Sequence, residues 1–149
     1  MTAALGVLAL VGGGLSAGVL FCVALSIAPA FAALPPGRYV EVHRLIGRPY
    51  DKVMPWTVLS TTAADIALAA RGGEATGLYA AAAGLLFAVS AISHLGNVPI
   101  NRRVKSLDPA AVPVGWNDPR MLWRNWNLLR TCCAIVAFAL TAAAVTVWR

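Results

Sequence analysis

Two apolar segments of the sequence carry polar side chains that could transfer a proton or hold a ligand. His94 and Asn97 are three residues apart at the end of one segment, while Trp123, Asn127 and Arg130 are four and three apart at the start of another. Residues at these spacings share one face of an α-helix. An imidazole can take a proton, and amide and guanidinium N–H groups can hold a developing negative charge. We therefore expect the five side chains to line one polar pocket.

The rise of an α-helix places these side chains at matching depths. At about 1.5 Å per residue, His94 lies roughly 27 Å from Thr76 and Arg130 roughly 27 Å from Trp148, the expected outer ends of their helices. The two asparagines fall about one turn deeper. The alternative is a structural role, in which Arg130 reaches the lipid headgroups and the asparagines cap broken helices. The set as a whole favours a ligand site at one end of a helix bundle.

Two further polar residues lie outside this set. His43 belongs to a polar connection near the same end and could close over the pocket. Asp65 lies in the middle of another apolar segment and shares a helical stripe with Thr57 and Thr61. A carboxyl group inside a membrane span either makes an interhelical hydrogen bond or serves a function, and both interpretations stay open. Its depth of only about 9 Å from the outer end puts a direct pair with Arg130 out of reach.

A metal site is another possible use of the histidines. His43, His94 and Glu41 would supply two imidazoles and one carboxylate, the smallest set for an open iron or copper centre. The long separation of the two histidines matches no metal-binding motif. Two alternatives therefore stay open, which are a protein without a cofactor and a protein that binds iron or copper.

The composition identifies the class of protein that must position these residues. Of the 149 residues, 59% are hydrophobic and only 12% are charged. A chain of this length can hold about four spanning helices of roughly 20 residues with short connections, and no second domain. The basic residues are not clustered as in nucleic-acid-binding proteins, which argues against a nucleic-acid partner. We predict a single all-α domain, residues 1–149, built as a four-helix bundle in a lipid bilayer.

The apolar runs predict four spans, at about residues 2–34, 55–70, 76–95 and 119–148. The first run carries no charge and exceeds the apolar stretch of a signal peptide, so we interpret it as a retained span and not as a cleaved secretory signal. Its Pro29 predicts a kink. Its Gly14 and Gly18 are spaced to let another helix, or a second copy of the chain, approach closely.

Polar segments join these spans. The segment from Arg38 to Lys52 mixes charged and apolar residues and predicts a short helix lying at the headgroups. Arg71-Gly72-Gly73-Glu74 predicts a tight turn. The third span should stop at Gly96 to Pro99, because the residue before a proline disfavours the α region. A second polar connection then runs from Pro99 to Asp118, and Asp118-Pro119 predicts the start of the last helix.

The distribution of basic residues predicts the orientation. Ten of the twelve Lys and Arg residues lie in the two long polar connections or near the start of the last helix, and only Arg71 and Arg149 lie on the other side. Under the positive-inside rule, both long connections face the cytoplasm and both termini face away from it. We expect a multi-pass protein of the inner or plasma membrane.

Short motifs in the sequence resemble those of a known family. Asn97-Val98-Pro99-Ile100-Asn101 follows the third span, Trp123-Arg124-Asn125-Trp126-Asn127-Leu128-Leu129-Arg130-Thr131 opens the fourth, and Ala28-Pro29-Ala30 lies near the end of the first. The chain is similar, over essentially its whole length, to the anthrone oxygenase-like family of small four-helix membrane proteins. The resemblance implies oxygenation of an activated aromatic substrate by molecular oxygen, such as conversion of an anthrone to an anthraquinone in secondary metabolism.

The resemblance also implies roles for the polar residues. His94 or His43 would be the base that removes an acidic CH proton, which lets the carbanion react with oxygen without a cofactor. Trp123 and Asp65 would contact the substrate. The developing oxyanion would be held by Asn97, Asn101, Asn127 and Arg130.

A different class of function stays open, namely a non-enzymatic membrane module such as a small transporter or an accessory subunit of a complex. Small four-helix exporters usually carry an acidic residue in the first span, which this chain lacks. A transport function would therefore depend on Asp65.

Overall fold

Helices account for all of the regular structure in the part of the chain that the computed structural model describes, residues 2–147. Three helical stretches in this range are long and apolar enough to cross a membrane, as expected of a membrane protein: Thr2–Ala33, Thr76–Ser106 and Arg120–Val147. The predicted all-α class is confirmed. The elements in order are α1 (Thr2–Cys22), the π-helical turn η1 (Val23–Ile27), α2 (Ala28–Ala33), α3 (Pro36–Ala69), α4 (Thr76–Ile92), the π-helical turn η2 (Ser93–Asn97), α5 (Val98–Ser106) and α6 (Arg120–Val147).

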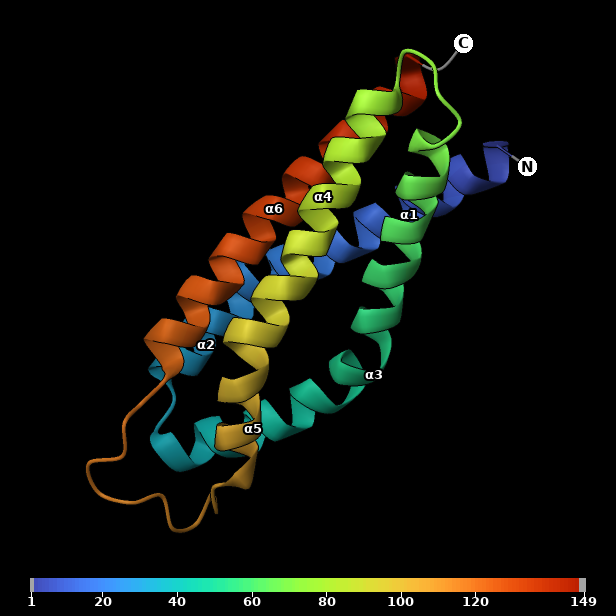
Figure 1. Ribbon diagram of the computed structural model, residues 1–149. Helices are drawn as coiled ribbons and strands as arrows, with labels where there is room; N and C mark the ends of the chain where they lie inside the picture. The colour runs from blue at the N-terminus through green and yellow to red at the C-terminus, as the bar shows by residue number, and fades with distance from the viewer. Residues whose placement is uncertain (1, 148–149) are drawn as a thin grey trace.

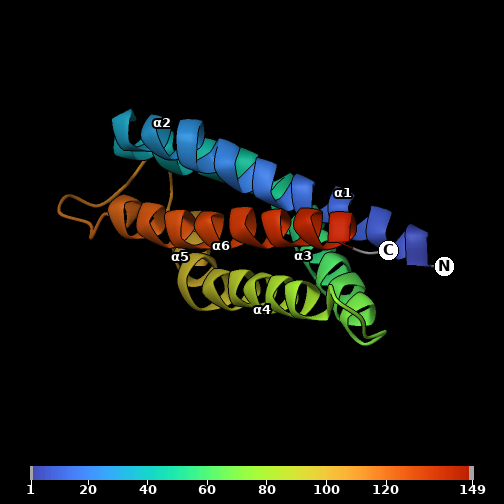
Figure 2. The same cartoon turned by 90° about the horizontal axis from the view of Figure 1, so that it is seen from above.

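Four long helices enclose the core. α6 lies between α1 and α4 in the view from above (Figure 2), and α3 also contacts both α1 and α4. The start of α1, the end of α6 and the turn between α3 and α4 lie at one end of the bundle, which we call the terminal end (Figure 1). α2, α5 and the first half of α3 lie at the opposite end beside the long loop 107–119, and we call this the loop end.

The buried apolar side chains form three clusters along the bundle. The cluster at the terminal end consists mostly of alanines with Leu68 and Tyr79, and the middle cluster contains Leu20 and Leu86. The cluster at the loop end is aromatic and includes Phe31, Tyr39 and Trp123. The loop end is therefore where flat side chains surround the polar residues singled out by the sequence.

The helix predicted to lie at the headgroups does not exist as a separate element. α3 continues without a break from Pro36 to Ala69, with Pro49 and Pro55 inside it, and it bends between its two halves (Figure 1). A proline inside a helix removes one backbone hydrogen bond and bends the helix instead of always ending it. The charged first half of α3 thus turns across the loop end while its second half runs along the bundle.

The third span continues beyond its predicted stop at Gly96 to Pro99. The backbone widens into η2, where the N–H of Val98 donates to the carbonyl of Ser93, and then continues as α5 to Ser106. The extra residue in this turn lets Val98 keep α-helical angles even though a proline follows it. The second polar connection is correspondingly shorter than predicted and occupies residues 107–119.

At Pro29, where a kink is expected, the helix also contains a π-helical turn. The N–H of Ala28 donates to the carbonyl of Val23, which closes η1 immediately before the proline. π-Helical turns are rare and occur often at functional sites. Here, each of the two π-turns is followed by a proline at the loop end.

Two predicted boundaries are confirmed. Gly72 and Gly73 have φ angles of 77° and 100°, values that favour glycine, in the tight turn after α3. α6 starts at Arg120, whose backbone N–H donates to Asp118 Oδ1 over 3.0 Å, as expected for a capping aspartate. The predicted end of this helix at Trp148 lies outside the described residues.

Close approach between α1 and α3 depends on a glycine other than the predicted pair. A Cβ atom at Gly12 would overlap Thr61 Oγ1, whereas a Cβ at Gly18 would meet nothing within 4 Å. A Cβ at Gly14 would make an ordinary contact of 3.4 Å with the Phe138 ring. Gly12 therefore sets the distance between the two helices, and Gly18 faces open space.

We predict that Gly12→Ala destabilises the bundle and that Gly18→Ala does not. The methyl group at position 12 must push Thr61 or the whole of α3 aside, at a cost of roughly 1–3 kcal/mol. Thermal unfolding of the two purified variants in the same detergent compares them directly. Equal unfolding temperatures would contradict the close contact between α1 and α3.

Candidate active site

A cavity of about 360 Å³ lies at the loop end of the bundle. Its volume falls within the usual range for small-molecule sites, roughly 300–1,000 Å³. Residues from all six α-helices and from both π-turns line it. The structure thus brings together six of the residues selected from the sequence, which are His43, His94, Asn97, Asn101, Trp123 and Arg130.

The amide of Asn101 joins three helices. Its Oδ1 accepts a hydrogen bond of 2.9 Å from Trp123 Nε1 and lies 3.2 Å from His43 Nε2. An indole N–H can only donate, so the atom facing it must be the amide oxygen. His43 Nε2 must then carry a proton and donate to the same oxygen. In the neutral imidazole, Nδ1 is therefore the basic nitrogen.

Aromatic side chains enclose the His43 ring. Phe31 stacks on it with ring centroids 5.3 Å apart and an interplanar angle of 28°, while Tyr39 and Trp123 approach edge-on at 5.3 and 5.7 Å. Burial among these rings lowers the pKa of His43 to about 4, although the hydrogen bond to Asn101 acts in the opposite direction. His43 is therefore neutral at pH 7, and its buried Nδ1 has no hydrogen-bond partner.

Arg130 is held by neutral groups. Its Nε and Nη2 donate to Asn127 Oδ1 over 3.1 and 2.8 Å, and its Nη1 donates to Ser93 Oγ over 3.2 Å. Asn127 is fully buried and is not among the residues that line the cavity. It therefore orients Arg130 instead of facing a ligand itself. Ser93 was missed by the sequence reasoning, although its position next to His94 places it at the same depth.

Asn97 also lines the cavity. Its Nδ2 donates to the backbone carbonyl of Trp123 over 3.2 Å, and its Oδ1 is buried without a partner. Its neighbour Gly96 allows Trp126 to pack closely, because a Cβ at this position would lie 2.6 Å from the indole ring. The side of η2 that faces α6 is therefore tightly packed. Asn97 Oδ1 is a hydrogen-bond acceptor without a partner where η2 meets α6.

His94 and Asp65 are placed differently from His43. His94 is exposed at the edge of the cavity, where its Nδ1 donates to the carbonyl of Ser90 over 2.9 Å. Asp65 is fully buried in the half of the bundle near the terminal end and accepts a hydrogen bond of 3.3 Å from Thr141 on α6. The structure does not bring Asp65 to the cavity, and its contact is the interhelical hydrogen bond considered from the sequence.

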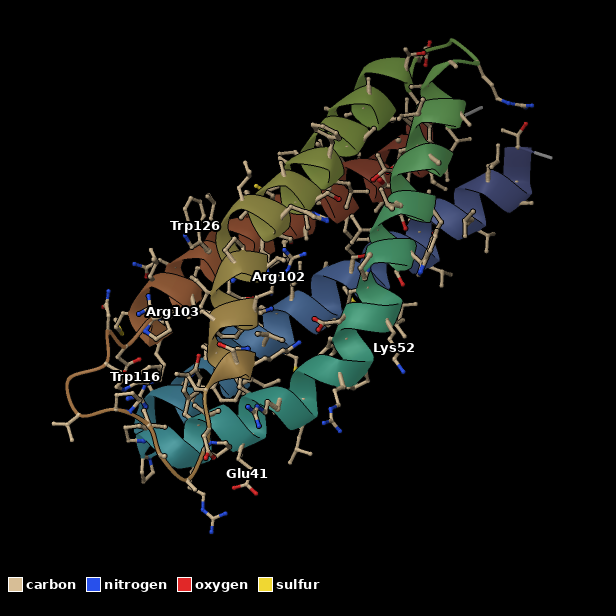
Figure 3. All side chains as sticks on the ribbon, turned by 60° about the horizontal axis from the view of Figure 1, so that its bottom comes forward. Glu41, Lys52, Arg102, Arg103, Trp116 and Trp126 are labelled. Carbon is tan, nitrogen blue, oxygen red and sulfur yellow. The ribbon has the colours of Figure 1, made fainter. Side chains whose placement is uncertain are left out.

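The three proposed metal ligands are not gathered together. Glu41 lies at the surface of α3, points away from the bundle (Figure 3) and pairs with Arg38 at 2.8 Å. Within residues 2–147, no three His, Cys, Asp or Glu side chains are close enough to hold a metal ion. The arrangement of Glu41, His43 and His94 therefore does not fit an iron or copper site.

Two arginines that the sequence reasoning left unassigned hold the walls of the cavity. Arg120 Nη1 donates to the carbonyls of Phe31 and Leu34 over 2.9 and 2.7 Å, at the end of α2. Arg44 donates to the carbonyl of Lys105 over 2.8 Å and to that of Leu107, at the end of α5. Both guanidinium groups donate to carbonyls at helix ends, where the regular intrahelical hydrogen bonds stop. Each of these contacts joins residues that are far apart in the sequence, so the sequence alone does not predict them.

We predict that His43 stays neutral, with its proton on Nε2, well below the ordinary histidine pKa. Because its pKa is lowered to about 4, the folded protein should not protonate this ring between pH 7 and about pH 5. Nitrogen NMR of histidine-labelled protein in detergent can follow this, because the chain has only two histidines and His94→Gln assigns the signals. A titration of the His43 signal centred near pH 6.5 would contradict the buried site.

The comparisons with known proteins identify a family for the chain. A family model described as anthrone oxygenase matches residues 43–140, about two thirds of the chain. The matched segment contains every predicted site residue except Glu41. No curated protein and no solved structure matches the chain. The family match covers well over half of the sequence, and the chain therefore belongs to the anthrone oxygenase family.

Proposed function

We propose that the protein is a membrane-bound oxygenase that oxidises an activated aromatic CH₂ group, such as that of an anthrone, in the cavity at the loop end. The observation that carries the proposal is the His43 imidazole, which is neutral, has a buried Nδ1 without a partner, and lines an aromatic-walled cavity that also contains Arg130. A base, flat walls and a cation are the groups required for making a carbanion from such a substrate. Membership of the family supports the same activity.

The proposed reaction needs no redox group from the protein. The base removes a CH proton, and the electron pair enters the adjacent ring system as an enolate. Transfer of one electron to O₂ and recombination of the two radicals give a peroxide, which takes up the proton. Loss of water from the hydroperoxide then leaves a new carbonyl group. One oxygen atom of O₂ enters the product and the other leaves as water, so each CH₂ oxidised consumes one O₂.

The residues divide this chemistry between them. His43 Nδ1 takes the proton, while the bond to Asn101 keeps the ring in the required tautomer. Arg130 and the free amide N–H groups of Asn101 hold the enolate oxygen. Trp123 and Phe31 pack against the substrate rings. Binding of the enolate next to a cation makes the CH proton more acidic, which compensates for the low basicity of His43.

The membrane topology is part of the proposal. We propose that the second half of α3 crosses the membrane together with the three longer apolar stretches, which gives four spans with both termini on the non-cytoplasmic side of the cell membrane. The support is the distribution of Lys and Arg, ten of which lie toward the loop end. We expect a reporter enzyme that works only after export to be active when it is fused to the C-terminus. A cytoplasmic signal would mean an odd number of spans or the opposite orientation.

Oxygen uptake by the purified protein with anthrone as substrate tests the activity. His43→Phe keeps an aromatic ring in the cluster but removes the base, so turnover should fall by roughly 10²–10⁴-fold with little loss of stability. His94→Gln should have a smaller effect, and Glu41→Gln, on the outer surface, should behave as the wild-type protein. Loss of activity in His94→Gln with an active His43→Phe would identify His94 as the base.

Labelled oxygen tests the reaction itself. With ¹⁸O₂, the product should gain one labelled carbonyl oxygen and the water one labelled atom. A label that comes from solvent water would contradict direct reaction with O₂. Failure of the wild-type protein to consume O₂ with any phenolic or anthrone-like compound, together with copurification of a partner, would favour the accessory-subunit function.

A further inference from the structure

The guanidinium of Arg130 has no negative partner. The three ion pairs in the described part of the chain involve Arg38, Lys105 and Arg120, and none involves Arg130. Its hydrogen bonds go only to the neutral side chains of Asn127 and Ser93. A positive charge inside a membrane-spanning helix is unfavourable unless an anion or a polar cavity accompanies it. The cavity that Arg130 lines is thus the place where a counter-ion can sit.

The donors of Arg130 are only partly used. A guanidinium group has five N–H bonds, and three of them are directed at Asn127 Oδ1 and Ser93 Oγ. One N–H on each terminal nitrogen remains free. Free N–H groups on a charged planar group can donate to the oxygens of a carboxylate or to a phenolate oxygen. Asn127 fixes the plane of the group from the side away from the cavity.

The charged residues around the cavity are mostly basic. Its lining contains the basic residues Arg102, Lys105 and Arg130 and a single acidic residue, Asp51. Asp51 is already paired with Lys105, so its charge is compensated. His43 is neutral, so it neither opposes nor attracts an anion at pH 7. The lining therefore has an excess of positive charge that a neutral ligand would leave unbalanced.

A second group in the lining calls for a hydrogen-bond donor from the ligand. Asn97 Oδ1 is buried and unpartnered, and the amide cannot be turned around, because its nitrogen already donates to the carbonyl of Trp123. A buried acceptor without a partner is unfavourable. A hydroxyl group on the ligand would satisfy it.

We infer that the cavity binds its aromatic ligand as an anion, with a carboxylate or phenolate on Arg130 and a hydroxyl group donating to Asn97 Oδ1. This inference rests on the cavity of the proposed function and names the class of substrate, namely hydroxylated aromatics with an acidic group. The inference can be tested by ligand binding alone, without any measurement of turnover. The enzymes that supply such a substrate must then leave an ionisable oxygen on the ring system.

Calorimetric titration of the purified protein in detergent tests the inference with ligands that cannot react. Hydroxynaphthoate and hydroxynaphthamide have the same shape but differ in charge, and we expect the acid to bind about tenfold or more tightly. Nitrophenolate compared with nitroanisole tests a phenolate in the same way. Binding without a preference for either anion over its neutral counterpart would overturn the inference, even if the protein consumed oxygen with anthrone.

Variants show which residue causes the preference. Arg130→Met should abolish it, while Arg124→Met, which removes the same charge from an exposed position on the same helix, should preserve it. If Arg130→Met does not fold, Arg130→Lys keeps the charge and should retain a reduced preference. Asn97→Leu should remove the advantage of hydroxynaphthoate over naphthoate. A preference that survives in Arg130→Met, or that is lost equally in Arg124→Met, would show that the general surface charge attracts the anion and would overturn the assignment to Arg130.

Discussion

The site depends on one constraint, which is that the indole N–H of Trp123 can donate a hydrogen bond but cannot accept one. It fixes the orientation of the Asn101 amide, and that amide in turn fixes the proton of His43 on Nε2. The backbone carbonyl of the same tryptophan holds the amide of Asn97. Through Trp123, residues from α3, α5, α6 and η2 are arranged as one unit. A change at this position would therefore alter the tautomer of the base and the orientation of both amides together.

The two π-turns supply the space for this arrangement. A π-turn contains one residue more than the corresponding α-helical turn, so it rotates every residue that follows it around the helix axis. η2 directs Asn97 toward α6 and lets α5 continue to Asn101, while η1 precedes Phe31, which stacks on the base. The prolines that follow the turns lack an N–H group, so a wider turn accommodates them without ending the helix.

The sequence predicted the features that depend on composition and helical rise. Apolar runs identified an all-helical membrane protein, and the depth calculation placed Asn97 about one helical turn from Arg130, close enough for both to line one cavity. It also separated Asp65 from Arg130 correctly. These quantities follow from counting residues along a helix, so they need no knowledge of neighbouring helices.

The features that the sequence did not predict depend on contacts between helices. Local rules for proline ended the third span too early and divided α3, because the packing that tolerates Pro49, Pro55 and Pro99 is not visible in the sequence. Counting residues gives the depth of a side chain but not the direction in which it points. It therefore placed His94 level with Arg130, although His94 is exposed at the edge of the cavity. The aromatic ring of Phe31 comes from a segment that had no polar pattern to mark it, and the hydroxyl of Ser93 was missed although it lies next to His94.

The arginines at the ends of α2 and α5 have a consequence for the relation between the protein and its membrane. Helix ends at the headgroup level ordinarily complete their hydrogen bonds with water or with lipid. Here Arg120 and Arg44 provide the donors for several of these carbonyls from within the chain. The walls of the cavity are thereby largely independent of the surrounding headgroups, so the same geometry can persist in bilayers of different lipid composition.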